Sequence, residues 1–156
     1  MTDTSTVRPA RPGEAPAVRA LVAAAGLPTA GLDEVWATLV ATLAGRPVGV
    51  AAIERHGPPE APVFLLRSVV VEDARRGSGL GAALVTAALA AADREVGAAA
   101  TIGLLTETAD GYFDRFGFTR VDRGDLPREL GASPELTGAC PDSARAYLRR
   151  PPEAPR

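Results

Sequence analysis

The fold is decided by one stretch of the chain, VFLLRSVVVEDARRGSGLGAALVTAALAAADREVG, residues 63–97. Residues 63–71 are almost all apolar and β-prone, which is typical of a buried central strand. A loop rich in arginine and glycine follows, and a helix is expected from Leu80 until Gly97 ends it. That helix carries small and apolar residues on one face, at Leu80, Leu84, Ala87, Ala88 and Ala91. The stretch therefore predicts a buried strand, a tight basic loop and an amphipathic helix.

The loop between that strand and that helix has the properties of a phosphate-binding site. A helix N-terminus exposes unpaired N–H groups and carries a partial positive charge. Glycine lets a bulky anion approach the main chain closely, and Arg75 and Arg76 add charge-assisted donors with a fork geometry. We therefore expect a diphosphate at residues 76–81, with Arg75 left open between a phosphate contact and solvent. The alternative is an ordinary strand-to-helix turn with a solvated basic face.

The order Arg76-x-x-Gly79-x-Gly81 after a buried strand resembles the signature of the GNAT superfamily of N-acetyltransferases. The segment LLTETADGYFDRFGF, residues 104–118, resembles the next strand and helix of that family, which usually end in a Gly-Phe pair. Residues 65–150 also resemble the branch known as arsenic-resistance N-acetyltransferases, through LLRSVVV, LLTETA, FDRFGF, an LP pair and CPDSA. The resemblance implies an α/β fold of the α+β type, whose mixed, mostly antiparallel sheet is splayed and flanked by helices.

The same resemblance implies acetyl-coenzyme A (acetyl-CoA) as the co-substrate, and no metal. In the family the loop holds the pyrophosphate, and the preceding strand splays or bulges and pairs its main chain with the pantetheine amides. The residues that the resemblance assigns to the cofactor are Val69, Val70, Val71, Arg76, Gly77, Ser78, Gly79, Leu80 and Gly81. A main-chain N–H there, such as that of Val69, could also stabilise the oxyanion as an amine attacks the thioester.

A second motif overlaps the same loop. Gly77-x-Gly79-x-x-Ala82 fits a dinucleotide fingerprint, which places its loop early in the unit and an acidic residue about 20 positions on. Here the loop lies in mid-chain after two strands of an expected hairpin, and the next strand reaches its acid only at Glu107. A Walker-type loop is excluded because it needs a lysine, and all 17 basic residues are arginine. The dinucleotide interpretation therefore stays the weaker alternative.

Acetyl transfer to an amine needs a base that takes a proton from the acceptor ammonium. Glu107 is the expected base, because it lies just past a strand expected to run parallel to the cofactor strand, where carboxyl ends form the crevice. The alternatives are a solvated loop carboxylate at Glu107 and a water chain that carries the proton. Glu72 and Asp73 lie nearer the loop and are expected to face solvent.

The expected general acid departs from the family pattern. Many relatives carry a tyrosine four residues before the glycine of the Gly-Phe pair, where this chain has Phe113. Tyr112 stands one place earlier and, on a helix, points about 100° away. Tyr112 is therefore named as the catalytic acid with a packing role as the alternative. A thiolate with a pKa near 8.5 can leave without a protein acid, so the substitution need not abolish catalysis.

Arg67 is a charged residue inside an otherwise apolar strand. Burying an unpaired guanidinium is costly, so Arg67 either pairs with a carboxylate or lines a cavity. In the second case it holds the carboxylate of an amino-acid-like substrate, and Thr106 and Thr108 hydrogen-bond the same ligand. The branch resemblance implies a small amino acid analogue with an arsenic or phosphorus oxyacid, such as arsinothricin or phosphinothricin, which is acetylated on its α-amine for detoxification.

Composition restricts the class of protein and its partners. The 156 residues include 46% hydrophobic and 23% charged residues, which favours one globular domain over residues 1–156 with frayed ends at 1–5 and 151–156. A net charge of −2 argues against nucleic-acid or anionic-membrane partners. One cysteine leaves no disulfide within the chain. No secretion signal or membrane span is recognisable, so a cytoplasmic location is expected. A homodimer stays open, since dimers are common in the family.

The remaining segments predict alternating strands and helices. Strands are expected at residues 7–10, 37–44, 48–54, 101–106, 118–121 and 144–149, and helical segments at 13–25, 32–36, 109–116 and 126–130. Gly45-Arg46-Pro47 signals a turn between two of the strands. The expected function is transfer of an acetyl group to the amine of a small molecule. The alternative is a regulatory module that binds acetyl-CoA without turnover.

Overall fold

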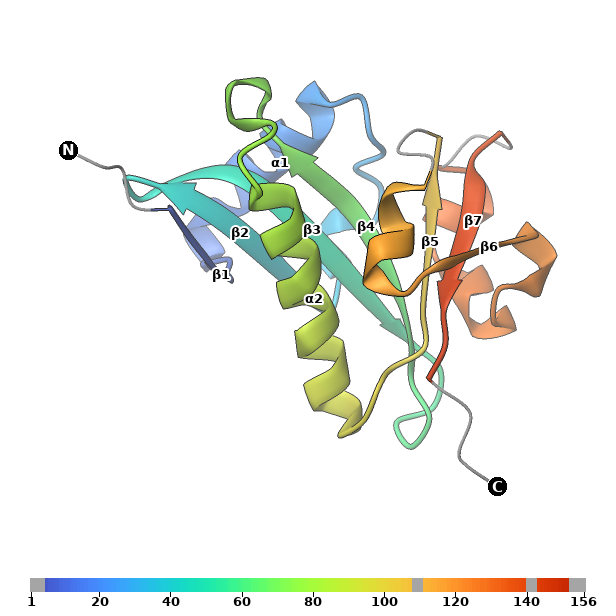
Figure 1. Cartoon of the computed structure of the whole chain (residues 1–156). Coiled ribbons are helices and arrows are strands. Elements are labelled where there is room, and N and C mark those ends of the chain that lie inside the picture. The colour runs from blue at the N-terminus through green and yellow to red at the C-terminus, as the bar shows by residue number, and fades with distance from the viewer. Residues whose placement is uncertain (1–4, 108–110, 140–142, 152–156) are drawn as a thin grey trace. The chain divides into compact units, whose positions relative to one another are not determined.

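The computed structural model describes residues 5–107, 111–139 and 143–151, and Figure 1 shows its labelled elements. Contacts divide the chain into two compact units, Met1–Glu54 with Leu66–Ala88, and Arg55–Leu65 with Leu89–Arg156. The strands are β1 Ser5–Pro9, β2 Ala37–Leu43, β3 Arg46–His56, β4 Val63–Val71, β5 Ile102–Thr106, β6 Thr119–Val121 and β7 Arg145–Arg149. The α-helices are α1 Ala15–Ala24 and α2 Leu80–Val96.

Short helical turns connect these elements. The 3₁₀ turns are η1 Pro12–Glu14, η2 Leu32–Glu34, η3 Asp73–Arg75, η4 Tyr112–Phe116, η5 Arg123–Asp125 and η6 Arg128–Ala132, and η7 Glu135–Ala139 is a kinked π-type turn. A single domain over the whole chain stays a prediction.

The described strands form a seven-stranded sheet in the order β1-β2-β3-β4-β5-β7-β6. The pairs β1–β2, β2–β3, β5–β7 and β6–β7 are antiparallel, whereas β4–β5 is parallel. The β4–β5 register runs through Phe64–Ile102 and Leu65–Gly103, while β4 itself continues to Val71. This mixed, mostly antiparallel sheet with helices confirms the predicted fold class.

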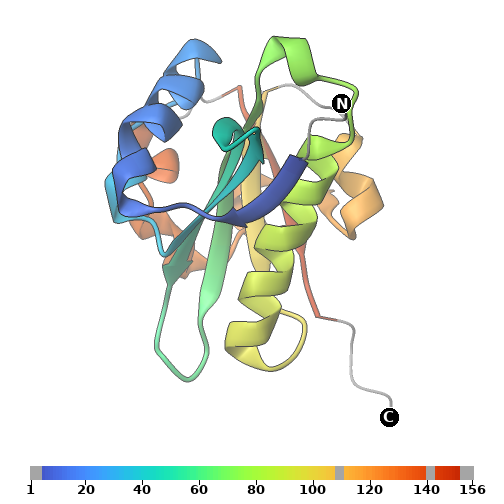
Figure 2. The same cartoon turned by 90° about the vertical axis from the view of Figure 1, so that its left-hand side faces the viewer.

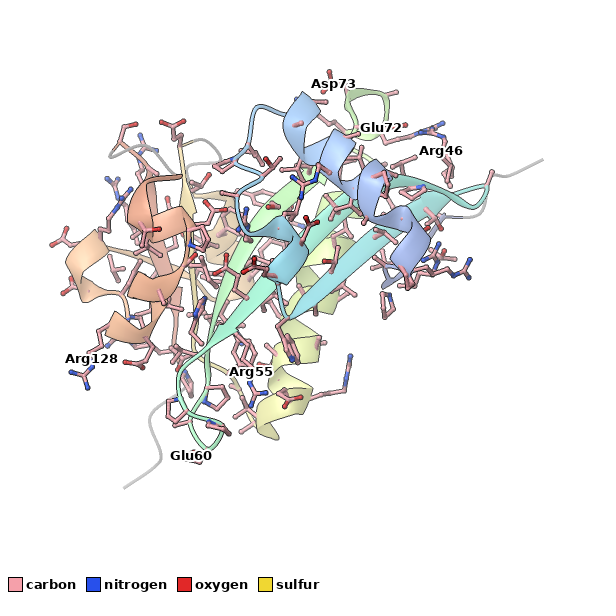
Figure 3. All side chains as sticks on the ribbon, turned by 180° about the vertical axis from the view of Figure 1, so that it is seen from behind. Arg46, Arg55, Glu60, Glu72, Asp73 and Arg128 are labelled. Atoms are coloured by element: carbon pink, nitrogen blue, oxygen red, sulfur yellow. The ribbon has the colours of Figure 1, made fainter. Side chains whose placement is uncertain are left out.

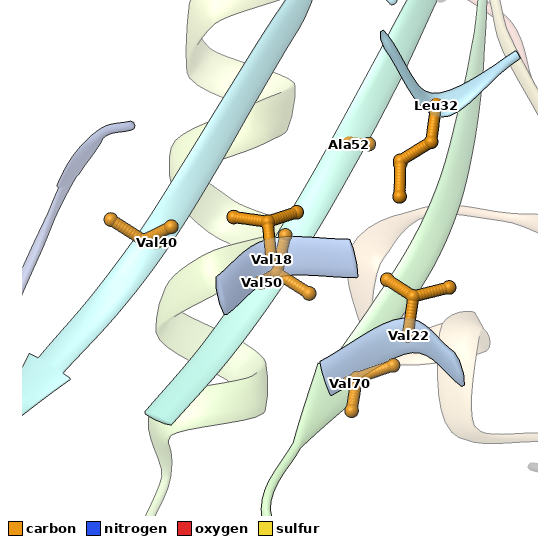
Figure 4. Packing of buried hydrophobic residues seen from close by; sticks show 7 residues of the cluster. All are labelled: Val18, Val22, Leu32, Val40, Val50, Ala52 and Val70. Carbon is orange, nitrogen blue, oxygen red and sulfur yellow. The ribbon is translucent and has the colours of Figure 1, made fainter. Parts of the chain in front are cut away.

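In the first unit, side-chain alternation along β3 assigns one helix to each face of the sheet. Val50 and Ala52 join Val18 and Val22 of α1 in one buried cluster, which Figure 4 shows from close by. Gly49, which directly precedes Val50, faces α2, because a Cβ atom there would meet Leu84 Cδ1 at 3.0 Å. Figure 2 shows α1 (blue) and the start of α2 (green) on either side of these strands.

The turn between β2 and β3 lies one residue earlier than predicted. Leu43 pairs with Arg46, so Ala44 and Gly45 alone form the loop. Both have left-handed backbones, with φ of 52° and 79°. That is the arrangement of a two-residue type I′ turn, whose twist matches that of the paired strands. Pro47 is therefore a strand residue, opposite Thr42.

The second unit uses the same alternation on β7. Ala146 and Leu148 pack with Leu126 and Leu130 in one cluster, whereas Tyr147, from the opposite face, contacts Phe113 of η4. Leu126, directly after η5, and the turn η6 therefore cover one face of this part of the sheet, and η4 covers the other.

Two sequence predictions about helices need correction. The buried face of α2 includes Val85 and Leu89, while Ala87 and Ala91 are only half-buried, because the larger side chains take the interior positions. Where the structure describes the helix expected at 109–116, it shows the 3₁₀ turn η4 instead, since Gly111 and Gly117, both left-handed, bound it.

Candidate active site

The predicted phosphate loop lies in the first unit, between β4 and α2, and is exposed over residues 76–79. Gly77 and Gly79 have φ of 79° and 84°, and a Cβ atom on either would meet nothing within 4 Å. These two positions need glycine for its left-handed backbone and leave open space beside the main chain. The arrangement gives an anion room to approach the main chain ahead of α2.

The loop ends in the first turn of α2, where the amide of Ala83 donates to the carbonyl of Gly79. The first amides of a helix have no partner within the helix, and their dipoles favour a negative charge. Arg76, whose side chain is 66% exposed, reaches Asp73 with Nη2 at 3.0 Å from Oδ1. The Ser78 hydroxyl donates to the carbonyl of Arg75 and holds the loop together. The predicted loop residues therefore come together around one exposed helix N-terminus.

Glu72 at the start of this segment is held by a bidentate pair. Arg46 donates from Nη1 and Nη2 to its two carboxylate oxygens at 3.1 and 3.0 Å. Both side chains are labelled in Figure 3. The hydrogen bonds from Arg46 lower the pKa of Glu72 below its ordinary value. A carboxylate held in this way is a poor proton acceptor. Glu72 is half-buried, whereas the sequence predicts that it faces solvent.

The cofactor strand β4 contains a left-handed residue. Ser68 has a φ of 57° although the residues around it are extended, and it is buried. Such a residue locally breaks the regular strand and turns the main chain that follows, as bulges do. The resemblance places a splay or bulge at residues 69–71, and the distortion begins one residue earlier. Val69, whose N–H is the predicted oxyanion donor, comes directly after it.

Arg67 is buried, with 1% of its side chain exposed, and its guanidinium contacts protein acceptors. Nη1 donates to Glu54 Oε2 at 3.0 Å and to the carbonyl of Ala30 at 2.7 Å. Nη2 donates to the carbonyl of Pro28 at 3.1 Å. The structure thus contains the ion pair that the sequence left open as an alternative. Contact between Arg67 and a substrate carboxylate stays a prediction.

Glu107 lies in the second unit, directly after β5, and is exposed. Its Oε1 accepts a hydrogen bond of 2.6 Å from the Ser143 hydroxyl, which precedes β7. An exposed carboxylate with one anchored oxygen can meet a substrate with the other, as a general base requires. Thr106 pairs with Arg145 across β5 and β7, whereas Thr108 lies outside the described residues.

Tyr112 opens η4 and is half-buried in an aromatic cluster. Its ring meets Phe113 and Phe116 edge to face, at centroid distances of 5.1 and 5.6 Å, and the Arg115 guanidinium lies over it at 5.3 Å. Phe113, at the family's tyrosine position, is buried against Phe118 and Tyr147. These contacts account for Tyr112 as a packing residue, and its role as an acid stays a prediction.

The second unit also has an open groove of about 430 Å³ beside η4 and β6, lined by Gly111, Asp114, Phe118, Thr119, Arg120 and Tyr147. It carries charges of both signs, on Asp114 and Arg120. Sequence analysis did not predict it: five of its residues lie in or directly beside the consecutive elements η4 and β6, and Tyr147 joins them only in the fold.

Sequence reasoning also missed three partners of the predicted residues. Ser68, Glu54 and Ser143 contact Arg67 or Glu107. The partners Glu54 and Ser143 are distant in sequence, so no spacing rule could find them. The one available signal was that Glu54 is an acidic residue at the end of an apolar run in β3. The predicted cofactor residues lie in the first unit, and Glu107 and Tyr112 lie in the second.

Comparison with known protein families identifies the family of this chain. Residues 34–120, more than half of the chain, match the acetyltransferase (GNAT) domain. The chain belongs to the GNAT family of acetyltransferases. The family confirms the predicted superfamily and the predicted class, an acyltransferase that uses acetyl-CoA. The arsenic-resistance branch stays a prediction. The comparison with curated proteins found no match.

Solved structures of GNAT proteins share the fold. An acetyltransferase of the GNAT family from Staphylococcus aureus is 14% identical, with a TM-score of 0.73 over 94% of this chain and 98% of that chain. A GNAT family acetyltransferase from Brucella melitensis in complex with acetyl-CoA is 26% identical, with a TM-score of 0.57 over 74% and 83%.

N-acetylglutamate synthase from Neisseria gonorrhoeae, complexed with coenzyme A and N-acetyl-glutamate, is also similar to this GNAT domain. It is 17% identical, with a TM-score of 0.75 over 98% of this chain and 36% of that chain. The chain thus spans little more than a third of the synthase.

Two further observations concern the described residues alone. No helix among them has the length and hydropathy to cross a membrane. No three of their His, Cys, Asp or Glu side chains gather as a metal site.

Proposed function

We propose that this GNAT domain transfers the acetyl group of acetyl-CoA to the amine of a small, anionic amino acid analogue. The finer part of the proposal, the acceptor, rests on the resemblance of residues 65–150 to the arsenic-resistance branch, whose substrates include arsinothricin and phosphinothricin. An amino acid acceptor is also in line with the N-acetylglutamate synthase that shares the fold, which was solved with N-acetyl-glutamate.

The observation that carries the proposal is the geometry of residues 76–81. Two left-handed glycines leave open space beside the main chain, and the loop leads into the 17-residue helix α2. Arg76 lies on the exposed side of the loop, where its present partner is the solvent-exposed Asp73. An exposed pair of this kind contributes little and is easily exchanged for a phosphate. The loop residues thus fit a diphosphate, which they would hold through main-chain N–H groups and a guanidinium.

Acetyl-CoA supplies an activated acetyl thioester when it is bound. The chain's own residues would then perform three tasks. The N–H of Val69, turned by the left-handed Ser68, would donate to the oxygen that gains negative charge. Glu107, with one oxygen anchored by Ser143, would take the proton from the acceptor ammonium. Tyr112 or a water would return a proton to the leaving thiolate.

The test is thiol release from acetyl-CoA in the presence of amines that differ in their acidic group. We expect release with L-phosphinothricin and with glutamate-like analogues, and little with polyamines, which carry the opposite charge. Glu107→Gln should lower kcat by about 10²-fold or more, because it removes the base. Glu60→Gln, which changes an exposed loop carboxylate of the same unit, is the matched control and should keep the rate. Turnover by Glu107→Gln at the normal rate would exclude Glu107 as the base.

A second function, binding of acetyl-CoA without turnover, is favoured by one observation. Phe113 occupies the position where many relatives carry a tyrosine, and it is packed against Tyr147 and Phe118. The same assay separates the two functions. A regulatory module would bind acetyl-CoA and release no thiol with any amine, and the change at Glu107 would then have no rate to alter.

A further inference from the structure

One buried guanidinium connects three segments of the first unit that are far apart in sequence. Arg67 donates to the main-chain carbonyls of Pro28 and Ala30 and to the carboxylate of Glu54, over 2.7–3.1 Å. Its Nε donates to the hydroxyl of the neighbouring Ser68 at 3.2 Å. The segment 28–30, β3 and the left-handed residue of β4 therefore share one side chain.

A purely structural role would not require an arginine at this position. A buried ion pair often contributes no more stability than apolar residues of similar volume, and the neighbouring positions Val63–Leu66 of β4 are apolar and buried. What an arginine adds is a rigid, planar set of donors that fixes the direction of each acceptor. Two of these acceptors are main-chain carbonyls, so the guanidinium sets backbone positions as well as a charge balance.

The segment held in this way is short and lacks regular structure at its centre. It follows α1 and leads into η2, whose residue Leu32 is buried in the core. Gly26 and Gly31, both left-handed, bound it. The Arg67 guanidinium contacts the carbonyls of Pro28 and Ala30 and also the hydroxyl of Ser68. Val69 follows Ser68 directly. Residues 28–30 are therefore linked through one side chain to the main chain that leads to Val69.

We propose that Arg67 is a positioning residue for acetyl transfer: it fixes the left-handed backbone of Ser68 and the main chain of residues 28–30 together. This inference rests on the proposed function, in which the N–H of Val69 faces the reacting thioester. Arg67 itself need touch neither substrate. Its loss would let the Val69 N–H and residues 28–30 move independently, while the phosphate loop at residues 76–81 would keep its own contacts.

The test compares Arg67→Met, which keeps the volume without the donors, with Arg149→Met as the matched control. Arg149 also binds a carboxylate, that of Asp93, and a main-chain carbonyl, that of Ala100. Acetyl-CoA affinity is measured by calorimetry, and the rate by thiol release with L-phosphinothricin and with water alone as acceptor. We expect Arg67→Met to bind acetyl-CoA normally and to release thiol about 10- to 100-fold more slowly, as misplacement of reacting groups does. Arg149→Met should keep the rate.

A second variant separates positioning from general loss of stability. Glycine adopts the left-handed backbone without help, so Ser68→Gly added to Arg67→Met should recover part of the rate. A folded Arg67→Met protein with the normal rate would overturn the inference. So would a double variant that recovers nothing, or loss of folding in both Arg67→Met and Arg67→Lys. If the unaltered protein releases no thiol, the proposed function fails first, which distinguishes the two failures.

Discussion

At the scale of single residues, Arg149 forms a partly buried ion pair that links three elements. Arg149 donates from Nη1 and Nη2 to the two carboxylate oxygens of Asp93 at 2.9 and 2.8 Å, and Asp93 also accepts from the amide of Ala100. The hydrogen bonds from Arg149, and then the one from Ala100, lower the pKa of Asp93. The pair joins the end of α2, the start of β5 and the end of β7 within the second unit.

This lowered pKa has a consequence for stability against pH. A carboxylate whose pKa is lower in the folded state stabilises that state above the unfolded pKa, near 4, and loses the effect as the pH falls further. Asp93→Asn should therefore reduce the free energy of unfolding by about 1 kcal/mol at pH 7. The difference from the unaltered protein should shrink below about pH 4. Urea unfolding at pH 7 and pH 3 measures both values.

The control for that experiment is Asp33→Asn. Asp33 pairs with Arg19 at 2.6 Å, but their side chains are 70% and 44% exposed. Exposed pairs contribute little, so we expect almost no change at either pH. If both substitutions changed the free energy of unfolding equally, the partly buried Asp93 pair would not stabilise the protein more than an exposed pair does, which would contradict the prediction.

The local structure at the candidate site residues was predictable where their own backbone or position carried the signal, while their roles stay predictions. The glycines of the phosphate loop, the place of Glu107 after β5 and the substitution at Phe113 all follow from local order in the chain. The contacts of Arg67 and Glu107 with Glu54, Ala30 and Ser143 do not, because they join segments 13 to 37 residues apart. Such pairs depend on the register between strands, which composition alone does not fix.

At the scale of elements, α2 and β3 approach each other closely at one glycine. A Cβ atom on Gly49 would lie 3.0 Å from Leu84 Cδ1 and 3.0 Å from the carbonyl oxygen of Val70. The second contact is with main chain, which cannot rotate away. Gly49→Ala should therefore destabilise the protein by about 1–3 kcal/mol, as overpacking does, and shift β4 at Val70. Thermal or urea unfolding gives the first effect, and acetyl-CoA affinity reports the second.

Gly13→Ala provides the matched comparison, because a Cβ atom there meets nothing within 4 Å and the backbone is not left-handed. We expect its stability to stay within experimental error of the unaltered protein or to rise slightly. If Gly49→Ala behaves in the same way, then α2 does not pack on β3 as closely as the structure indicates.

Among the elements, the strongest sequence patterns were predicted best. The bounds of β4 and the start of α2 agree with the sequence prediction, since a long apolar run and a glycine-rich loop delimit them. The β2–β3 turn was displaced because Ala44, unusually for alanine, takes a left-handed backbone. The prediction of a helix at Tyr112–Phe116 was wrong because Gly111 and Gly117, both left-handed, bound a 3₁₀ turn of only five residues there.

At the scale of the whole molecule, family membership and the order of strands agree with a GNAT acetyltransferase. The sequence could indicate this because loop, strand and Gly-Phe pair follow one another in the family's order. The acceptor could not be predicted in the same way, because its surroundings are assembled from side chains and loops that carry no shared motif. A cytoplasmic location and a homodimer also stay predictions.

The most direct test of the account is calorimetric titration of the protein with acetyl-CoA, with NAD as the competing ligand. We predict tight binding of acetyl-CoA and none of NAD. Arg76→Ala should weaken acetyl-CoA binding by about tenfold or more, because it removes a charge-assisted phosphate contact. Arg128→Ala, which removes an arginine with 98% of its side chain exposed, is the control and should bind normally. Binding of NAD alone, or equal affinity in Arg76→Ala and the unaltered protein, would contradict the assignment of residues 76–81 as the acetyl-CoA diphosphate site.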